Sequence, residues 1–175
     1  MSKNGIEGYA ALDFEASSLS AHSWPIEVGI SWIEEKQVKT WSSLIRPHPV
    51  WDTSDWSSKS EAVHGIPLLD LQAAPPAAQV ASELLTMASG LILTSDAPEF
   101  EFHWLSRLFD AGGCVQAHEI EDFHAVSFRL YSGFALDMLY ETLEQTKVPH
   151  RAGPDSARLA GGWLKALEIE ARENQ

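Results

Sequence analysis

The chain has 175 residues, of which 45% are hydrophobic and 21% charged, and its formal net charge at pH 7 is −13. This length fits a single domain with a sizeable core, covering residues 1–175, and the composition is ordinary for a soluble globular protein. The acidic balance excludes a coat protein for long nucleic acid, which needs a basic stripe, and favours a short, end-bound or small substrate.

The first predicted element is a strand over residues 9–15, where side chains alternate in character. Residues two positions apart on a strand point to the same face of the sheet. Asp13 and Glu15 therefore share one face, as a joint metal site requires. The intervening apolar residues, Leu12 and Phe14, point to the opposite face.

Two more strands are predicted over residues 26–33 and 39–45. The polar segment 34–37 between them reads as a tight turn, so these strands form an antiparallel meander. The following stretch, residues 46–60, is rich in Pro, Trp and Ser and predicts a loop.

The middle of the chain alternates between helical and extended patterns. Apolar residues recur at helical spacing over 77–88 and again over 99–109, with a glycine pair at 112–113 ending the second helix. A short buried strand is predicted between them, over residues 91–94. We expect a fifth strand near residues 115–118.

Two helices are predicted in the C-terminal part, over residues 134–146 and from Pro154 onward, since proline suits a first helical turn. In the last helix, Asp155 lies four and eight residues before Leu159 and Trp163. This spacing places Asp155 on the inward face, near the start of the helix.

Glu101 also lies on an apolar helix face. It is three, four and seven positions before Trp104, Leu105 and Leu108, which is the spacing of residues on one side of a helix. A carboxylate that faces a core is costly unless it is paired or bound to metal. Glu101 is therefore a candidate metal ligand. Asp96, at the end of the preceding predicted strand, is the alternative.

An Asp-x-Glu pair near the N-terminus and a His-x4-Asp pattern near the C-terminus together supply Asp13, Glu15, His150 and Asp155. Two-metal hydrolysis of a phosphodiester needs several hard oxygen ligands around two cations about 3.5–4 Å apart, and a neutral imidazole can accept a proton from the attacking water. Each pattern alone is weak, since Asp155 can equally cap a helix. Their combination in this order, on an α/β pattern of elements, is far more specific.

In these residues the chain resembles the DEDDh 3′–5′ exonucleases, a family of proofreading subunits and RNA-trimming enzymes with an RNase H-like fold. The resemblance extends over residues 9–165. Its first motif is Leu12-Asp13-Phe14-Glu15-Ala16-Ser17-Ser18-Leu19, followed by Pro25-Ile26-Glu27-Val28-Gly29, and its third is His150-Arg151-Ala152-Gly153-Pro154-Asp155. Val63-His64-Gly65-Ile66 is similar to the family's His-Gly-Ile segment. In the second motif, Glu101 stands where the family usually has Asp.

The resemblance implies an α/β fold, with a mixed five-stranded sheet that includes an antiparallel meander and is flanked by helices. It also implies a metal-dependent 3′–5′ exonuclease that uses two divalent cations, Mg²⁺ or Mn²⁺. Such an enzyme would hydrolyse phosphodiester bonds at the 3′ ends of single-stranded DNA or RNA, or of short oligonucleotides, and would release nucleoside 5′-monophosphates. The sequence does not divide DNA from RNA.

Roles for individual residues follow from the same resemblance. Asp13, Glu15 and Asp155 would hold one cation, with Asp13 bridging to a second. Glu101 or Asp96 would complete the coordination sphere of the second cation. His150 would act as the general base. The residues expected to meet the substrate are Ala16, Ser17, Ser18, Leu19, His64 and Arg151, although His64 also fits a structural role in a turn or core, and Arg151 fits a salt bridge.

Two other functions remain open at this point. The Glu at position 101 is compatible with a catalytically weakened module that binds a nucleotide or a protein partner. The acidic net charge is compatible with a hydrolase for small nucleotides.

Cys114 is the single cysteine and suits a reducing cytoplasm. Because neither a signal peptide nor a transmembrane segment is recognisable, we expect a cytoplasmic protein without a membrane partner.

Overall fold

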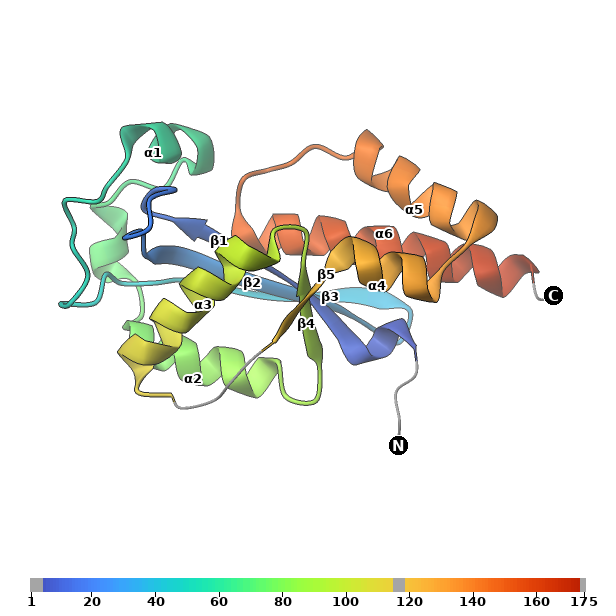
Figure 1. Ribbon diagram of the computed structural model, residues 1–175, viewed down its shortest axis with the longest axis horizontal. Helices are drawn as coiled ribbons and strands as arrows, with labels where there is room; N and C mark the ends of the chain where they lie inside the picture. Colours follow the sequence, from blue (N-terminus) through green and yellow to red (C-terminus); the bar gives the residue numbers. More distant parts are fainter. Residues whose placement is uncertain (1–4, 115–118, 174–175) are drawn as a thin grey trace.

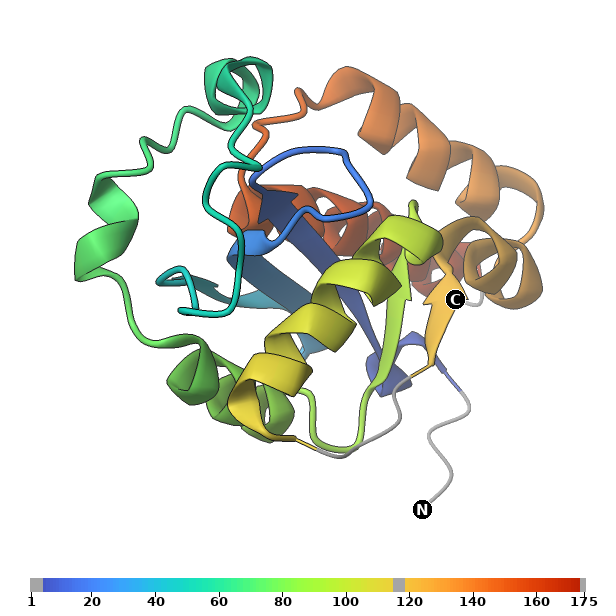
Figure 2. The same cartoon turned by 60° about the vertical axis from the view of Figure 1, so that its left-hand side comes forward.

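The structure is a computed structural model that describes residues 5–114 and 119–173. Its centre is one mixed sheet of five strands in the order β3-β2-β1-β4-β5. Helices cover both faces of this sheet, and the sheet is seen between α3 and α6 in Figure 2. The predicted α/β class and the mixed five-stranded sheet are therefore confirmed.

Three antiparallel strands form the predicted meander: β1 (Tyr9–Ala16), β2 (Pro25–Glu34) and β3 (Gln37–Leu44). The turn between β2 and β3 consists of Glu35 and Lys36, whose φ angles are 52° and 58°. Positive φ at both central residues is the geometry of a two-residue hairpin turn whose twist matches that of the strands.

The other two strands run parallel to β1. β4 (Ile92–Ser95) pairs with β1, and β5 (Ile120–Asp122) pairs with β4. The fifth strand expected at residues 115–118 falls outside the described residues. The described strand at this edge of the sheet is β5, which begins after that segment.

The helices are α1 (Ser58–His64), α2 (Ala77–Met87), α3 (Pro98–Gly112), α4 (Phe123–Leu130), α5 (Gly133–Gln145) and α6 (Ala152–Glu173), with 3₁₀ turns η1 (Ile6–Gly8) and η2 (Asp70–Ala73) (Figure 1). Among these, α2, α3, α5 and α6 match the predicted helices. None of the helices in the described ranges is long and apolar enough to cross a membrane.

Two short helices were not predicted, and both depend on capping. α1 lies partly in the predicted loop; the side chain of Ser57 accepts a hydrogen bond from the Ser60 N–H at its start, and Gly65 ends it with a φ of 67°. α4 starts where Asp122 accepts a hydrogen bond from the Ala125 N–H at 2.7 Å. Such caps satisfy backbone groups that a short helix leaves open.

Each face of the sheet has its own hydrophobic core, and β1 contributes to both by alternation. Leu12 and Phe14 pack in the core beneath α2 and α3. Tyr9 and Ala11 pack in the opposite core, which α4, α5 and α6 cover. The predicted alternation of β1 is therefore confirmed, and it fixes which face Asp13 and Glu15 occupy.

α6 begins at Ala152, two residues before the predicted start at Pro154. Proline is tolerated there because the first backbone N–H groups of a helix have no partner within it. The first turn is closed by Asp155, whose N–H donates to the Arg151 carbonyl oxygen at 2.9 Å. Its carboxylate accepts the Arg151 N–H at 3.0 Å.

Candidate active site

Three carboxylates from distant parts of the chain meet at one end of the sheet. Asp13 and Glu15 project from β1, and Asp155 projects from the first turn of α6. Each offers a carboxylate oxygen, and these oxygens lie within 4.8 Å of one another. A cation with metal–oxygen distances of about 2.0–2.6 Å can draw such a group into one coordination sphere.

Glu101 brings a fourth carboxylate from the first turn of α3. Its side chain is only 3% exposed, and its Oε2 atom has no hydrogen-bond partner among the described residues. Asp155 is in a similar state: Oδ2 accepts the Arg151 N–H, while Oδ1 is buried without a partner in the described part of the chain. A buried carboxylate oxygen without a partner is costly, so both atoms call for a positive ligand.

The electrostatics of the cluster point the same way. Burial first, and then the charges of Glu15 and Asp155, raise the pKa of Asp13 from 3.8 to about 9. Burial and the charge of Asp155 raise the pKa of Glu15 to about 7. Burial, followed by the charge of Asp13, also raises the pKa of Glu101 well above its usual range. Burial and mutual repulsion thus raise the pKa values of these carboxylates, and the charge of Arg151 offsets the rise at Glu15 only in part.

A pocket of about 300 Å³ opens beside the cluster. Asp96, which is exposed at the end of β4, lines this pocket together with Glu101. His150 lies on its rim, exposed, in the loop between α5 and α6. The pocket also contains Arg158, one turn after Asp155 on α6. The structure thus brings all five predicted catalytic residues, and the alternative Asp96, to one cavity.

A second hollow of about 210 Å³ adjoins the first. Leu19 lines both hollows, and its side chain is 75% exposed between them. Ala16 and Ser18 line the second hollow, with Lys59 and His64 on its other side. Four of the six residues expected to meet the substrate therefore gather here.

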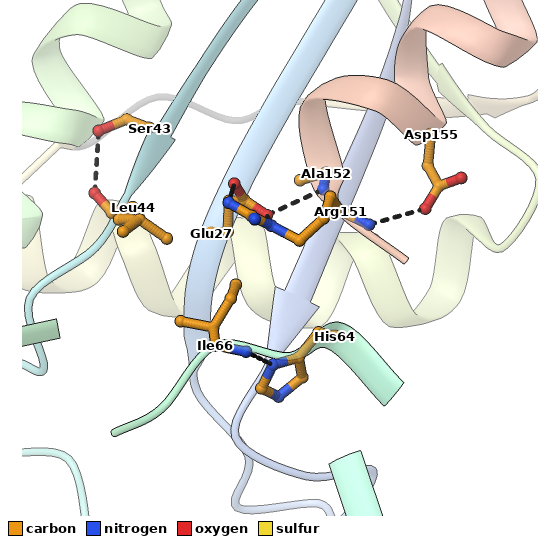
Figure 3. Close-up of polar contacts among 8 residues, drawn as sticks. All are labelled: Glu27, Ser43, Leu44, His64, Ile66, Arg151, Ala152 and Asp155. Atoms are coloured by element: carbon orange, nitrogen blue, oxygen red, sulfur yellow. Dashed lines mark hydrogen bonds and ion pairs between the residues drawn. The ribbon is translucent and has the colours of Figure 1, made fainter. Parts of the chain in front are cut away.

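One ring nitrogen of His64 forms a hydrogen bond within the turn after α1, and the other has no hydrogen-bond partner among the described residues. Its Nδ1 atom accepts the Ile66 N–H at 3.0 Å, which places the proton of a neutral ring on Nε2 (Figure 3). Burial lowers the pKa of His64, which favours this neutral ring. Nε2 is buried and has no partner among the described residues. Both readings of His64 are thus compatible with the structure, since the residue supports a turn and also borders a hollow.

Ser17 and Arg151, the other two expected substrate residues, line neither hollow. Ser17 is buried, and its hydroxyl accepts the Trp24 N–H at 3.0 Å, so it braces the loop after β1. The guanidinium of Arg151 contacts Glu27 on β2 (Figure 3), and its charge offsets part of the rise in the pKa of Glu15.

Several residues of the site were not singled out from the sequence. Glu27 is buried beside the cluster, and its signal was a charge within the apolar strand 25–30. Phe100 and Trp104 line the main pocket with ring centroids 5.8 Å apart. Phe100 directly precedes Glu101, but helical spacing alone gave no reason to bring a half-exposed aromatic into the site.

Solved structures share this fold at low sequence identity. The nuclease domain of 3′hExo, a DEDDh family member bound to rAMP, aligns over 96% of this chain and 95% of its own, with a TM-score of 0.66 and 14% identity. A 3′-exonuclease described in recognition of the histone mRNA stem-loop aligns over 95% and 84%, with a TM-score of 0.65 and 14% identity.

The zinc-bound complex of E. coli ExoI with single-stranded DNA aligns over 93% of this chain, with a TM-score of 0.63 and 8% identity. This chain spans only 40% of that protein's length. Comparison by sequence gives no match among family models or curated proteins. The similarity is therefore one of three-dimensional structure, and the chain has the RNase H-like fold of the DEDDh 3′-exonucleases.

Proposed function

We propose that the protein is a metal-dependent 3′–5′ exonuclease of the DEDDh family. It hydrolyses phosphodiester bonds at the 3′ end of short or single-stranded nucleic acid and releases nucleoside 5′-monophosphates. The observation that carries this proposal is the convergence of Asp13, Glu15 and Asp155, whose oxygens lie within 4.8 Å of one another at the pocket that His150 borders.

The structural neighbours support the same class of substrate. ExoI was solved with single-stranded DNA and with a dA16 oligonucleotide, and 3′hExo with rAMP, a nucleoside monophosphate. These neighbours share the fold of this chain, and they support a nucleic-acid 3′ end as the occupant that we propose for its pocket.

The donor set fits divalent cations of the Mg²⁺ or Mn²⁺ type. All its ligands are carboxylate oxygens, which hard cations prefer, and the buried atoms Glu101 Oε2 and Asp155 Oδ1 have no other partner among the described residues. We assign Asp13, Glu15 and Asp155 to the first cation, and Asp13 with Glu101 to a second. When bound, two such ions activate a water and stabilise the oxygens that attack and leave.

We assign the role of general base to His150. It lies on the exposed rim of the pocket, where a neutral imidazole can accept the proton of the attacking water. The exposed rim also lets the imidazolium return this proton to solvent after each turnover. Asp96, which also lines this pocket, is the alternative to Glu101 as a ligand.

The two hollows suit the last two nucleotides of a single strand. Leu19 stands between them, and the Phe100 and Trp104 rings offer an apolar surface on which a base can stack. Lys59 lines one hollow and Arg158 the other, so each has one cation for phosphate. This modest positive lining within a chain of net charge −13 agrees with a site that takes a strand end.

A direct test uses 5′-labelled oligonucleotides of about ten nucleotides, in DNA and RNA form, with Mg²⁺, Mn²⁺ or EDTA. We expect shortening by single nucleotides from the 3′ end, with loss of activity in EDTA and in Asp155→Asn. A substrate whose 3′-terminal linkage is a phosphorothioate should be cut more slowly. Binding without hydrolysis would instead identify a binding module, and hydrolysis of dinucleotides alone a small-nucleotide hydrolase.

A further inference from the structure

Glu27 is a buried carboxylate that the proposed chemistry does not use. It is 4% exposed, and its two oxygens accept three hydrogen bonds from Arg151 and from Ala152, the first residue of α6. Arg151 donates from Nε at 2.9 Å and from Nη2 at 2.7 Å, and the Ala152 N–H donates at 3.0 Å (Figure 3). A bidentate pair of this kind fixes orientation as well as charge.

The same face of β2 contacts α6 at two further positions. A side chain at Gly29 would lie 2.3 Å from the backbone of Ala152, so only glycine permits the observed approach. Two residues further along β2, the hydroxyls of Ser31 and Ser156 lie 2.9 Å apart. Positions 27, 29 and 31 therefore hold the first turn of α6 at three successive points.

Arg151 links this anchor to the catalytic residues on both of its sides. Its N–H donates to Asp155, while His150 directly precedes it in the chain. His150 has a φ of 54°, in the left-handed region that non-glycine residues rarely adopt. Such a conformation persists only where the surrounding structure imposes it. The neighbouring Arg151 is well placed to impose it, because both its backbone and its side chain are bound.

Arg151 also compensates a charge that would disturb the cluster. Glu27 stands directly opposite Glu15 in the register of β1 and β2. Like charges that face each other across two strands repel. The guanidinium of Arg151, although its side chain is 43% exposed, lies 2.7 Å from Glu27 and offsets this second carboxylate.

We propose that Glu27 and Arg151 form a positioning pair, which sets the geometry of His150 and Asp155 from β2, and that Arg151 does not bind substrate phosphate. The proposal deepens the proposed exonuclease function and rests on it for its effect on catalysis. Its structural part, the fixing of the first turn of α6, can be measured without any substrate.

The experiment compares Glu27→Gln, Arg151→Met, Arg151→Lys and the double variant Glu27→Gln/Arg151→Met. The control is Arg129→Met, because Arg129 forms an exposed ion pair with Glu121 on the surface, at 2.6 Å. We would measure kcat and KM on a single-stranded oligonucleotide, Mn²⁺ affinity by calorimetry, and hydrogen exchange of the amides at 151 and 152.

A positioning pair predicts that Glu27→Gln and Arg151→Met each lower kcat by about 10- to 100-fold with little change in KM. The double variant should be no slower than the slower single variant, since each single substitution already disrupts the same Glu27–Arg151 pair. Arg151→Lys should recover part of the rate, and Arg129→Met should behave as wild type. A raised KM in Arg151→Met, with wild-type kinetics in Glu27→Gln, would overturn the proposal and make Arg151 a phosphate ligand.

Failure of the proposed function gives a different pattern. If the wild-type protein hydrolyses no nucleic acid, the exchange measurement still decides: amides 151 and 152 should exchange at least tenfold faster in Glu27→Gln than in wild type or Arg129→Met. Unchanged exchange would refute the pair. If Arg151→Met does not fold, because it leaves Glu27 buried without a counter-charge, Glu27→Gln and Arg151→Lys carry the same comparison.

Discussion

Asp13 and Asp155 come from the first strand and the last helix of the fold, yet their carboxylate oxygens lie within 4.8 Å of each other. In the absence of a cation, this proximity works against folding, because burial and mutual repulsion penalise the charged forms. A ligand that binds only the folded state reverses the effect.

Divalent cations should therefore stabilise the protein. We expect millimolar Mn²⁺ or Mg²⁺ to raise the melting temperature by several degrees, because binding to the folded state shifts the unfolding equilibrium. Asp13→Ala should abolish both this response and hydrolysis. Differential scanning fluorimetry with EDTA as reference measures the first effect. A melting temperature indifferent to Mn²⁺, together with activity in Asp13→Ala, would refute the two-metal site.

The pH dependence of stability without metal has a defined sign. Glu15 and Asp13 have folded-state pKa values of about 7 and about 9, above their ordinary values of 4.5 and 3.8. The unfolded chain therefore releases these protons first as the pH rises. Stability from both groups is fully present below about pH 4 and is lost as the pH rises through 7 and then 9.

This loss of stability is best measured by comparing the wild-type protein with Asp13→Asn in EDTA. Asp13→Asn should lose less stability than wild type between pH 5 and pH 9, as measured by chemical denaturation, because the amide does not titrate. Saturating Mg²⁺ should flatten the difference by stabilising the carboxylates. Parallel pH profiles for the two proteins would show that Asp13 is ionised in the metal-free fold.

His150→Ala should lower kcat by roughly 10²–10⁴, the usual contribution of general-base catalysis. Metal binding should survive, since the carboxylate ligands are unaffected; calorimetric titration with Mn²⁺ would verify this. His124→Ala is a suitable control, because His124 pairs with Tyr140 at 2.9 Å, away from the described pocket residues. Wild-type turnover by His150→Ala would make His150 a structural residue.

Glu101 and Asp96 are distinguished by substitution at each position. Glu101→Ala should nearly abolish hydrolysis, because Glu101, unlike Asp96, is buried and its Oε2 has no hydrogen-bond partner among the described residues. Glu101→Asp should keep or improve Mg²⁺-supported hydrolysis, because the longer Glu side chain suits Mn²⁺ better than the strict octahedral sphere of Mg²⁺. Asp96→Ala should cost less rate than Glu101→Ala. The reverse order of the two alanine variants in steady-state assays would assign the metal to Asp96.

Leu19→Ala should raise KM by roughly tenfold while kcat changes little, because an exposed apolar side chain between the hollows contributes contact area with bases. Leu69→Ala is a matched control, since Leu69 is 79% exposed and lines neither hollow. Steady-state kinetics on one oligonucleotide are sufficient. Equal KM values for the two variants would exclude Leu19 from substrate contact.

Much of the fold could be predicted because its signals are periodic. The two-residue alternation of β1 placed Asp13 and Glu15 on one face, and the helical spacing around Glu101 and Asp155 pointed both carboxylates inward. These are local patterns, and the structure confirms each of them. The fifth strand was expected at residues 115–118, which lie outside the described residues; the bounds of the three-residue β5 depend on its parallel pairing with β4, which sequence periodicity does not record.

The arrangement around Arg151 shows what local patterns leave out. Arg151, beside His150, was compatible with phosphate binding or with a salt bridge; the structure shows a salt bridge, and its partner Glu27 lies on a strand far earlier in the chain. Nothing near either residue in the sequence encodes this contact. Similarly, the hydroxyl of Ser17 accepts a hydrogen bond from the backbone N–H of Trp24, because the loop after β1 folds back on itself.

The division of the carboxylate cluster between β1 and α6 has a consequence for a protein made from its N-terminus onward. Asp13 and Glu15 lie on the first strand of the sheet, whereas Asp155 is synthesised only after the five described strands. A growing chain therefore lacks one of the three clustered carboxylates until α6 has been synthesised. A cation that needs all three carboxylates could therefore bind only after α6 has docked on β2.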